Sequence, residues 1–254
     1  MRIGLLTDLH YRCAVAGTSR IARRECRRVG EILERALEGL VAAGAGLLVC
    51  AGDCVDDETA PGVPEDLADL RARFLATGLP LVIVPGNHDP PAEDFYAILP
   101  RPPRRQRIGE CQVLTFGDDP FDPQTQLATR AEDTLRWMRQ ALDRPATGGP
   151  TLLVQHYALY PEHSGPGYRH TYANDAAIRA VLEEAAGRGA SAGPGRLLAL
   201  SGHNHRGSPL TTHRGVSYLT GRALCEHPFP YYLLHTQGSV VRVEERTVAG
   251  EGYS

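Results

Sequence analysis

Short apolar runs alternate with segments of helical spacing in the first third of the sequence, and this alternation limits the chain to few folds. Three apolar runs, Arg2–Leu6, Leu47–Cys50 and Leu81–Val84, stand between turn signals and are typical of buried strands. Apolar residues recur at helical spacing between them, from Ile21 to Val41 and from Glu65 to Thr77. Parallel strands joined by crossover helices have this order. The pattern therefore predicts an α/β fold.

The rest of the chain continues this pattern and then changes. Further strands and helices are predicted at Gln112–Phe116, Glu132–Leu142, Leu152–Gln155, 174–186 and Leu197–Leu200. The last fifty residues alternate more strongly and predict a meander, with strands at Gly215–Leu219, Tyr231–His235 and Val240–Glu244. The Arg-rich stretch 100–107 predicts a solvated loop, because no aromatic residues separate its charges for nucleic-acid binding. We interpret residues 1–254 as a single domain.

Composition excludes several classes of function. The 254 residues are 42% hydrophobic and 22% charged, with a net charge of −3, so no overall field attracts nucleic acid or a membrane surface. Every basic residue is Arg, which can hold a phosphate through two hydrogen bonds. The six Cys form no C-x-x-C pair, no signal peptide fits before Asp8, and no apolar run reaches the roughly 18 residues of a membrane span. We expect a cytoplasmic protein.

Polar residues with lone pairs follow the predicted strands. They are Asp8, His10, Asp53, Asn87, His88, His156, His203 and His205. In open α/β sheets the ligand crevice lies at the carboxyl ends of the strands, so we expect these side chains to meet at one sheet edge. Imidazole and carboxylate without Cys suit Mn, Fe or Zn in a hydrolytic site. The triplet Asn-His-Asp alone could be an ordinary surface turn, but the other strand ends argue against that interpretation.

The order of these motifs resembles the calcineurin-like metallophosphoesterase superfamily. The motifs are Asp8-Leu9-His10, Gly52-Asp53-Cys54-Val55-Asp56, Gly86-Asn87-His88-Asp89, His156 and Gly202-His203-Asn204-His205. Each motif is weakly specific alone, whereas all five in this order are highly specific. They span residues 8 to 205, so the resemblance covers most of the chain. It implies a four-layered αββα sandwich of two mixed β-sheets flanked by helices.

The resemblance also implies a dinuclear metal site with divalent or trivalent ions. One ion would take Asp8, His10 and His205, the other would take Asn87, His156 and His203, and Asp53 would bridge both. A hydroxide bridging the two ions would be the nucleophile. His88 would face the substrate, where it stabilises charge or protonates the leaving group. Asp56 would orient the His88 imidazole through its far nitrogen.

Other residues near the motifs are candidates for substrate binding. Arg206 directly follows the last ligand and could bind phosphate, or else pair with a neighbouring carboxylate. Tyr11 and Tyr160 flank ligand loops and could stack on a base. His163 and His170 stand in a Gly/Pro-rich loop after His156, where they could line the substrate mouth or be ordinary surface residues.

Within the superfamily, the chain most resembles small phosphodiesterases and nucleotide pyrophosphatases. The protein phosphatases usually carry G-D-x-V-D-R-G and G-N-H-E, whereas this chain has Asp57 and Asp89 at the deciding positions. No long insertion offers a cap, which indicates an open pocket. The resemblance therefore implies a phosphodiesterase that hydrolyses a phosphodiester or pyrophosphate bond of a small nucleotide-type or glycerophospho-type substrate.

Two alternatives remain. A DNA-processing nuclease would share the fold, but neutral charge and the lack of an extra domain count against it. A non-catalytic binding module of the same fold would be marked by lost ligands, and none is lost.

Overall fold

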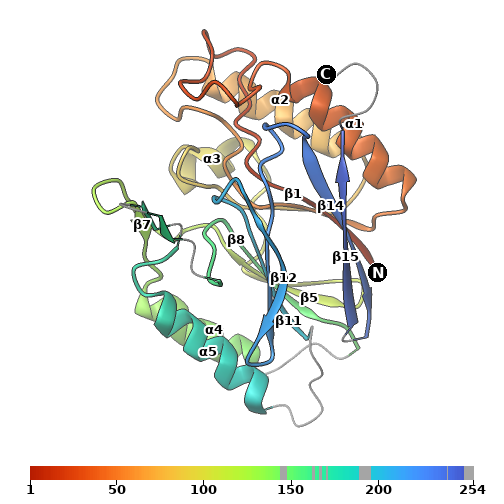
Figure 1. The fold of residues 1–254 in the computed structure, drawn as a ribbon, viewed down its shortest axis with the longest axis vertical. Helices are drawn as coiled ribbons and strands as arrows, with labels where there is room; N and C mark the ends of the chain where they lie inside the picture. The colour runs from red at the N-terminus through yellow and green to blue at the C-terminus, as the bar shows by residue number, and fades with distance from the viewer. Residues whose placement is uncertain are drawn as a thin grey trace.

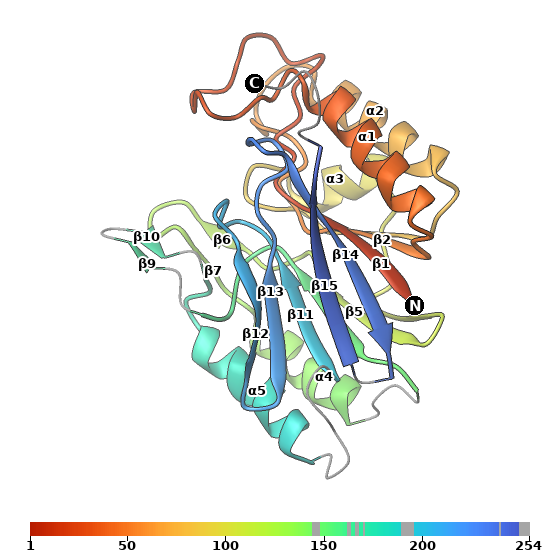
Figure 2. The same ribbon diagram turned by 45° about the vertical axis from the view of Figure 1, so that its right-hand side comes forward.

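The computed structural model describes residues 1–143, 148–161, 164–165, 168–169, 171–188, 196–238 and 240–248. Two β-sheets pack face to face, and helices cover the outer face of each sheet (Figures 1 and 2). This arrangement confirms the predicted four-layered αββα sandwich. No helix within the described ranges is long and apolar enough to cross a bilayer.

The first sheet contains the strands from the beginning and the end of the chain. Its spatial order is β15, β14, β1, β2, β3. The strand bounds are β1 Arg2–Leu6, β2 Leu47–Cys50, β3 Leu81–Ile83, β14 Pro230–Gln237 and β15 Val240–Thr247. Strands β1, β2 and β3 are parallel, whereas β14 is antiparallel to both β1 and β15. The helices of this half are α1 Val29–Ala42, α2 Val63–Ala76 and α3 Ala92–Ile98.

The second sheet is built from the middle of the chain, in the spatial order β12, β13, β11, β8, β5, β4. Its strands are β4 Arg105–Ile108, β5 Cys111–Phe116, β8 Thr151–Gln155, β11 Leu197–Ser201, β12 Ser208–His213 and β13 Val216–Thr220. Its helices are α4 Glu132–Leu142 and α5 Asp175–Arg188. Two short pairs complete the described elements: β6 Phe121–Asp122 with β7 Leu127–Ala128, and β9 Ser164–Gly165 with β10 Tyr168–Arg169.

Three apolar clusters hold these layers together. Alternation along β1 illustrates how: Ile3 and Leu5 enter the cluster between the two sheets, whereas Leu6 enters the cluster beneath α1 and α2. Gly4 lets α1 approach closely, because a Cβ there would lie 2.6 Å from Leu40 Cδ1. A third cluster packs α4 and α5 against the outer face of the second sheet. The central strands are buried on both faces, and this is why their sequences are continuous apolar runs.

The first predicted helix begins later than its periodicity indicates. Residues from Ile21 to Arg28 form turns and an isolated bridge instead of helix, and α1 begins at Val29. Within the preceding segment, the Ser19 hydroxyl donates to Asp56 Oδ1 at 3.1 Å. The segment before α1 is therefore directed toward the strand ends by polar contacts that apolar periodicity does not report.

The three C-terminal strands are present as β13, β14 and β15, but the prediction that they form one meander is wrong. Strands β12 and β13 join the second sheet, where β13 pairs with β11, whereas β14 and β15 join the first sheet beside β1. Side chains on both faces of β13 and of most of β14 are buried, because each strand lies in a sheet that is covered on both faces. The loop predicted at 100–107 also includes part of edge strand β4, whose arginines alternate toward solvent.

Candidate metal centre

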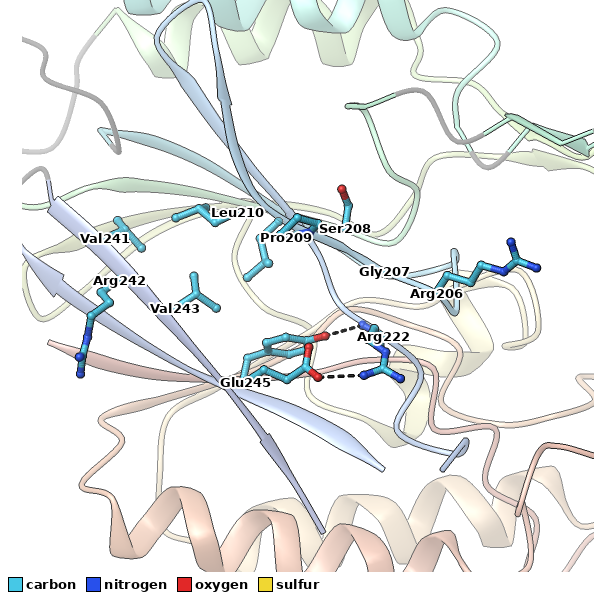
Figure 3. A pocket seen from close by; sticks show the side chains of 12 residues that line it. Arg206, Gly207, Ser208, Pro209, Leu210, Arg222, Val241, Arg242, Val243 and Glu245 are labelled. Carbon is cyan, nitrogen blue, oxygen red and sulfur yellow. Dashed lines mark hydrogen bonds and ion pairs between the residues drawn. The ribbon is translucent and has the colours of Figure 1, made fainter. Parts of the chain in front are cut away.

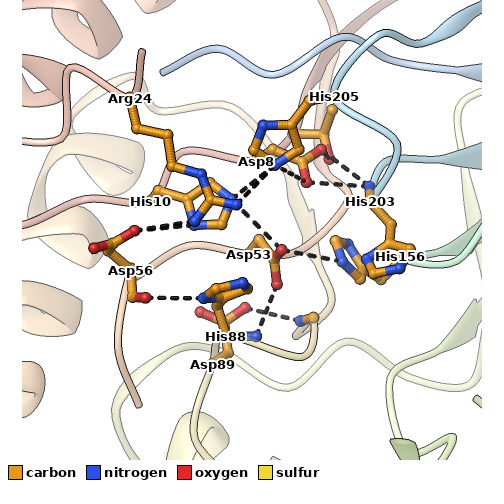
Figure 4. A network of polar contacts seen from close by, with 12 residues as sticks. Asp8, His10, Arg24, Asp53, Asp56, His88, Asp89, His156, His203 and His205 are labelled. Atoms are coloured by element: carbon orange, nitrogen blue, oxygen red, sulfur yellow. Dashed lines mark hydrogen bonds and ion pairs between the residues drawn. The ribbon is translucent and has the colours of Figure 1, made fainter. Parts of the chain in front are cut away.

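The side chains predicted as metal ligands come from strand ends in both sheets. Asp8 and His10 follow β1, Asp53 follows β2, and Asn87 follows β3 in the first sheet. His156 follows β8, and His203 and His205 follow β11 in the second sheet. Figure 4 shows the labelled ligands converging on a common centre. The site thus spans two neighbouring sheets, where the spacing of the strands alone predicted one sheet edge.

The first cluster comprises Asp8, His10, Asp53 and His205. Each offers one ligand atom, and these atoms all lie within 4.8 Å of one another. His10 Nε2 lies 3.0 Å from His205 Nε2 and 3.6 Å from Asp53 Oδ2. His205 Nε2 lies 3.5 Å from Asp8 Oδ1. Two imidazoles and two carboxylates at these separations can hold one metal ion.

The second cluster comprises Asp53, His156 and His203, again with ligand atoms within 4.8 Å of one another. His156 Nε2 lies 3.3 Å from Asp53 Oδ2, so one carboxylate belongs to both clusters. Two buried atoms, Asn87 Oδ1 and His156 Nε2, make no hydrogen bond within the described part of the chain. Buried polar atoms normally have partners, and a second metal ion would satisfy both.

Burial and neighbouring charges shift the pKa values of these groups. Burial raises the pKa of Asp53, but His156 and His88 outweigh this effect and hold it well below the usual value. Burial lowers the pKa of His156, yet the neighbouring negative charge of Asp53 raises it to about 9. Burial lowers the pKa of His10 and raises that of Asp8. Asp53 is therefore an anionic carboxylate among imidazoles, as a bridging ligand must be.

Hydrogen bonds from Nδ1, the ring nitrogen that faces away from the cluster, orient two of the histidines. His156 Nδ1 donates to the Ala51 carbonyl at 2.7 Å, and His205 Nδ1 donates to Glu226 Oε1 at 2.5 Å. Burial raises the pKa of Glu226, but the hydrogen bonds from His205 and Arg23 lower it to about 2. These contacts leave each Nε2 lone pair for a metal ion. Sequence reasoning missed Glu226, which lies in a loop without a motif.

The carboxylates are oriented by backbone N–H groups. Asp8 accepts from the His203 N–H, and Asp53 Oδ1 accepts from the His88 N–H at 2.9 Å. Asp89 accepts from the N–H groups of Cys54, Val55 and Gly86, at 3.0, 2.9 and 2.8 Å. Burial and the charge of Asp53 raise the pKa of Asp89 to about 7. Asp89 therefore links the loop after β2 to the loop after β3.

The backbone at the site is strained. Asp8, His10, Asp53 and His203 have φ values of 53°, 45°, 51° and 67°, in the left-handed region that side chains disfavour. Gly202 has no such φ, but a Cβ there would overlap Thr7 Oγ1. This close approach explains why glycine precedes the His203 ligand.

His88 lies beside the first cluster, with its ring edge-on to His10 at a centroid distance of 4.7 Å. Its Nδ1 donates to the backbone carbonyl of Asp56 at 2.8 Å. The prediction that Asp56 orients His88 therefore needs a correction, because the contact comes from the main chain. The Asp56 carboxylate instead contacts Arg12 at 3.3 Å and Arg24 at 3.2 Å.

The prediction that Tyr11 binds substrate is wrong. Tyr11 is 2% exposed and packs in the cluster beneath α1 and α2, where its hydroxyl donates to Asp69. Tyr160 stacks on His213 with ring centroids 4.5 Å apart. His163 and His170 lie outside the described residues.

Arg206 is exposed and lies at the rim of a pocket of about 550 Å³ between β12 and β15. Figure 3 shows its side chain directed away from the ion pair between Arg222 and Glu245 in that pocket. A phosphate-binding role for Arg206 stays a prediction.

A match to a known protein family covers most of the sequence. The family described as calcineurin-like phosphoesterase matches residues 1–226. The chain belongs to the calcineurin-like phosphoesterase family. No curated protein sequence matches the chain.

Solved structures share the fold of this family member at low identity. A dimetal phosphatase from Danio rerio is 14% identical, with a TM-score of 0.69 over 98% of this chain and 99% of that chain. A protein from Thermus thermophilus is 16% identical, with a TM-score of 0.60 over 97% of this chain and 98% of that chain. A purple acid phosphatase from yellow lupin, Lupinus luteus, is 11% identical, with a TM-score of 0.58 over 99% of this chain and 52% of that chain.

The calcineurin-like phosphoesterase family implies a dinuclear divalent metal site and phosphoester hydrolysis, and the donor set described above fits that site. The two clusters share Asp53, and the buried Asn87 Oδ1 and His156 Nε2 are donors that a metal ion would use. Cys225 also lies within range of His10 and His205. Burial raises the pKa of its thiol well above the usual value.

Proposed function

We propose that this chain hydrolyses a phosphodiester or pyrophosphate bond of a small nucleotide-type or glycerophospho-type substrate. The observation that carries the proposal is the pair of His/Asp clusters that share the Asp53 carboxylate. Two metal ions bound there would activate water and stabilise negative charge at phosphorus. The ligand set is intact, which favours a catalyst over a non-catalytic binding module of the same fold.

The two clusters support a division of the seven predicted ligands between two ions. Asp8, His10 and His205 would hold the first ion, Asn87, His156 and His203 the second, and Asp53 both. Oxygen and imidazole donors without thiolate suit Mn, Fe or Zn. We treat residues 1–254 as one domain, because both sheets supply ligands. A cytoplasmic location and a small-molecule partner in preference to nucleic acid stay predictions from the sequence.

His88 is the residue best placed to move a proton. Its Nδ1 is held by the Asp56 carbonyl, so its Nε2 is left to meet substrate beside the first cluster. A group at hydrogen-bond range of the departing oxygen would protonate the leaving group as the bond to phosphorus breaks. This contact uses the main chain of Asp56 and not its carboxylate.

A hydrolysis panel with Mn-loaded protein tests the proposal. It should include bis-p-nitrophenyl phosphate, p-nitrophenyl phosphate, cyclic AMP, ADP-ribose and a glycerophosphodiester. We expect faster turnover of bis-p-nitrophenyl phosphate than of the monoester at neutral and mildly alkaline pH, and turnover of at least one of the last three compounds. Faster turnover of p-nitrophenyl phosphate would contradict the diester assignment, and Asp53→Ala provides the inactive control.

A further inference from the structure

Arg24 reaches the metal centre from the turn segment before α1, where periodicity predicted helix. Its side chain is only 8% exposed. Figure 4 shows the guanidinium among His10, Asp56 and His205, on the side of the first cluster. Neither the motifs nor the family match assigns it a role.

One edge of the guanidinium is held in place by the protein. Nη1 donates to Asp56 Oδ1 at 3.2 Å and also lies 3.2 Å from His10 Nδ1. Asp56 is itself fixed by the Ser19 hydroxyl at 3.1 Å and by Arg12 at 3.3 Å. The Asp56 carboxylate therefore anchors Arg24 with its remaining donors turned toward the ligands.

The other edge of the guanidinium, formed by Nε and Nη2, has no acceptor that would remain after metal binding. Nε is buried and has no hydrogen-bond acceptor among the residues that the structure describes. Nη2 lies 3.5 Å from His205 Nε2, the nitrogen that the proposed function assigns to a metal ion. That lone pair cannot serve Arg24 once it binds a metal, so two donors on one edge are left for another acceptor.

Arg130 shows how this chain satisfies a buried arginine that has a structural role. Its Nε donates to Asp119 at 3.0 Å, and its Nη2 donates to Asp119, Gln155 and Tyr172 at 2.6, 3.1 and 2.8 Å. An unpaired buried donor destabilises the protein more when it is charged than when it is neutral. Buried charged donors therefore normally have hydrogen-bond acceptors. A ligand that accepts hydrogen bonds from Nε and Nη2 would therefore satisfy the free edge of Arg24.

We propose that Arg24 binds two phosphoryl oxygens of the substrate through its Nε and Nη2 donors. A guanidinium edge presents two parallel N–H groups that match two oxygens of a phosphate. The acceptor is a phosphate group with free oxygens, whether in an ester, an anhydride or inorganic phosphate. Asp56 is then a positioning residue for Arg24. The proposal rests on the proposed function, because it needs His205 to bind metal.

Inorganic phosphate is the probe that separates Arg24 from the metals. We would titrate phosphate into Mn-loaded wild type, Arg24→Ala, Arg24→Lys and the matched control Arg20→Ala, an exposed arginine of the same segment. Circular dichroism checks folding, and metal analysis gives the Mn content of each variant. We expect Arg24→Ala to keep its Mn and to lose about tenfold or more in phosphate affinity, as for a charged hydrogen bond. Arg24→Lys should recover only part of it, since an ammonium lacks the planar edge.

Kinetics with bis-p-nitrophenyl phosphate complete the test. KM should rise in Arg24→Ala and stay at the wild-type value in Arg20→Ala. Unchanged phosphate affinity in Mn-loaded Arg24→Ala would overturn the proposal, as would loss of Mn in both Arg24 variants, which would make Arg24 part of the metal centre. An inactive wild type would reject the proposed function, whereas the phosphate titrations would still decide the role of Arg24.

Discussion

The Asp53 carboxylate belongs to both ligand clusters, so its removal should affect both ions at once. We expect wild type to hold about two Mn ions per chain after reconstitution, as a two-metal site requires. Asp53→Ala should lose most of both ions, measured by elemental analysis. The control is Asp57→Ala, whose partly exposed carboxylate lies in the same loop. Folded wild-type protein without bound Mn would contradict the dinuclear site.

His88 offers a test that separates chemistry from metal binding. His88→Ala should keep both ions and lose rate by about 10²–10⁴-fold, the usual contribution of a general acid. The loss should be large for a ribose-like alkoxide leaving group and small for p-nitrophenolate, which leaves without a proton. Single-turnover kinetics with both ester types measure this difference, with His235→Ala as the control. Equal losses for both leaving groups would reject proton transfer and leave charge stabilisation.

The candidate ligands could be predicted from motifs because they follow strand ends, and strand ends can be found from apolar runs. The supporting residues have no such signal. Glu226 meets His205, and Arg24 meets Asp56, through loop paths that no periodicity encodes. Tyr11 fails as a substrate residue for a related reason. It follows the His10 ligand directly, yet its ring points into the core beneath α1 and α2.

At the scale of elements, the buried Arg130–Asp119 pair joins the segment after β5 to the end of β8. Arg130 also stacks on Phe116, with its guanidinium carbon 3.8 Å from the ring centroid, and contacts Gln155, the residue before the His156 ligand. Removing one partner of a buried ion pair costs about 3–5 kcal/mol. We therefore expect Asp119→Ala to lower the free energy of unfolding by about that amount in urea denaturation.

Asp118→Ala is the matched control for this variant. Asp118 is the adjacent carboxylate, but it is exposed, and it forms a surface ion pair at 3.5 Å with Arg101, which is also exposed. Its loss should change the free energy of unfolding by less than about 1 kcal/mol, as for most surface pairs. Equal effects of the two substitutions would mean that the buried network does not stabilise this half of the molecule.

Strand positions near the site could be predicted, whereas their assignment to sheets could not. The runs that became β1, β2, β8 and β11 are buried on both faces, so their apolar sequences are unambiguous. The partner of a strand is a separate question, since β14 pairs with β1 from the opposite end of the sequence. Periodicity describes how one segment alternates and contains no information about such distant pairing.

At the scale of the whole molecule, the metal centre connects the two sheets. The predicted ligands that follow β1, β2 and β3 lie at the edge of one sheet, and those that follow β8 and β11 lie at the edge of the other. Ions that bind only the folded state should raise its stability, by about 4 kcal/mol when free metal exceeds its Kd a thousandfold. We expect EDTA to lower the thermal midpoint of wild type and to leave that of Asp53→Ala unchanged. Equal midpoints with verified Mn binding would contradict this linkage.

The left-handed backbone of Asp8, His10, Asp53 and His203 has a consequence for protein engineering. Residues other than Gly, Asn and Asp pay about 1–2 kcal/mol for this conformation. A screen for thermal stability alone would therefore favour glycine or asparagine at the two histidine positions. Because the same positions are predicted metal ligands, we expect such a screen to produce a more robust but inactive chain. Selection for stability should hold these four residues fixed and search the helices and outer strands.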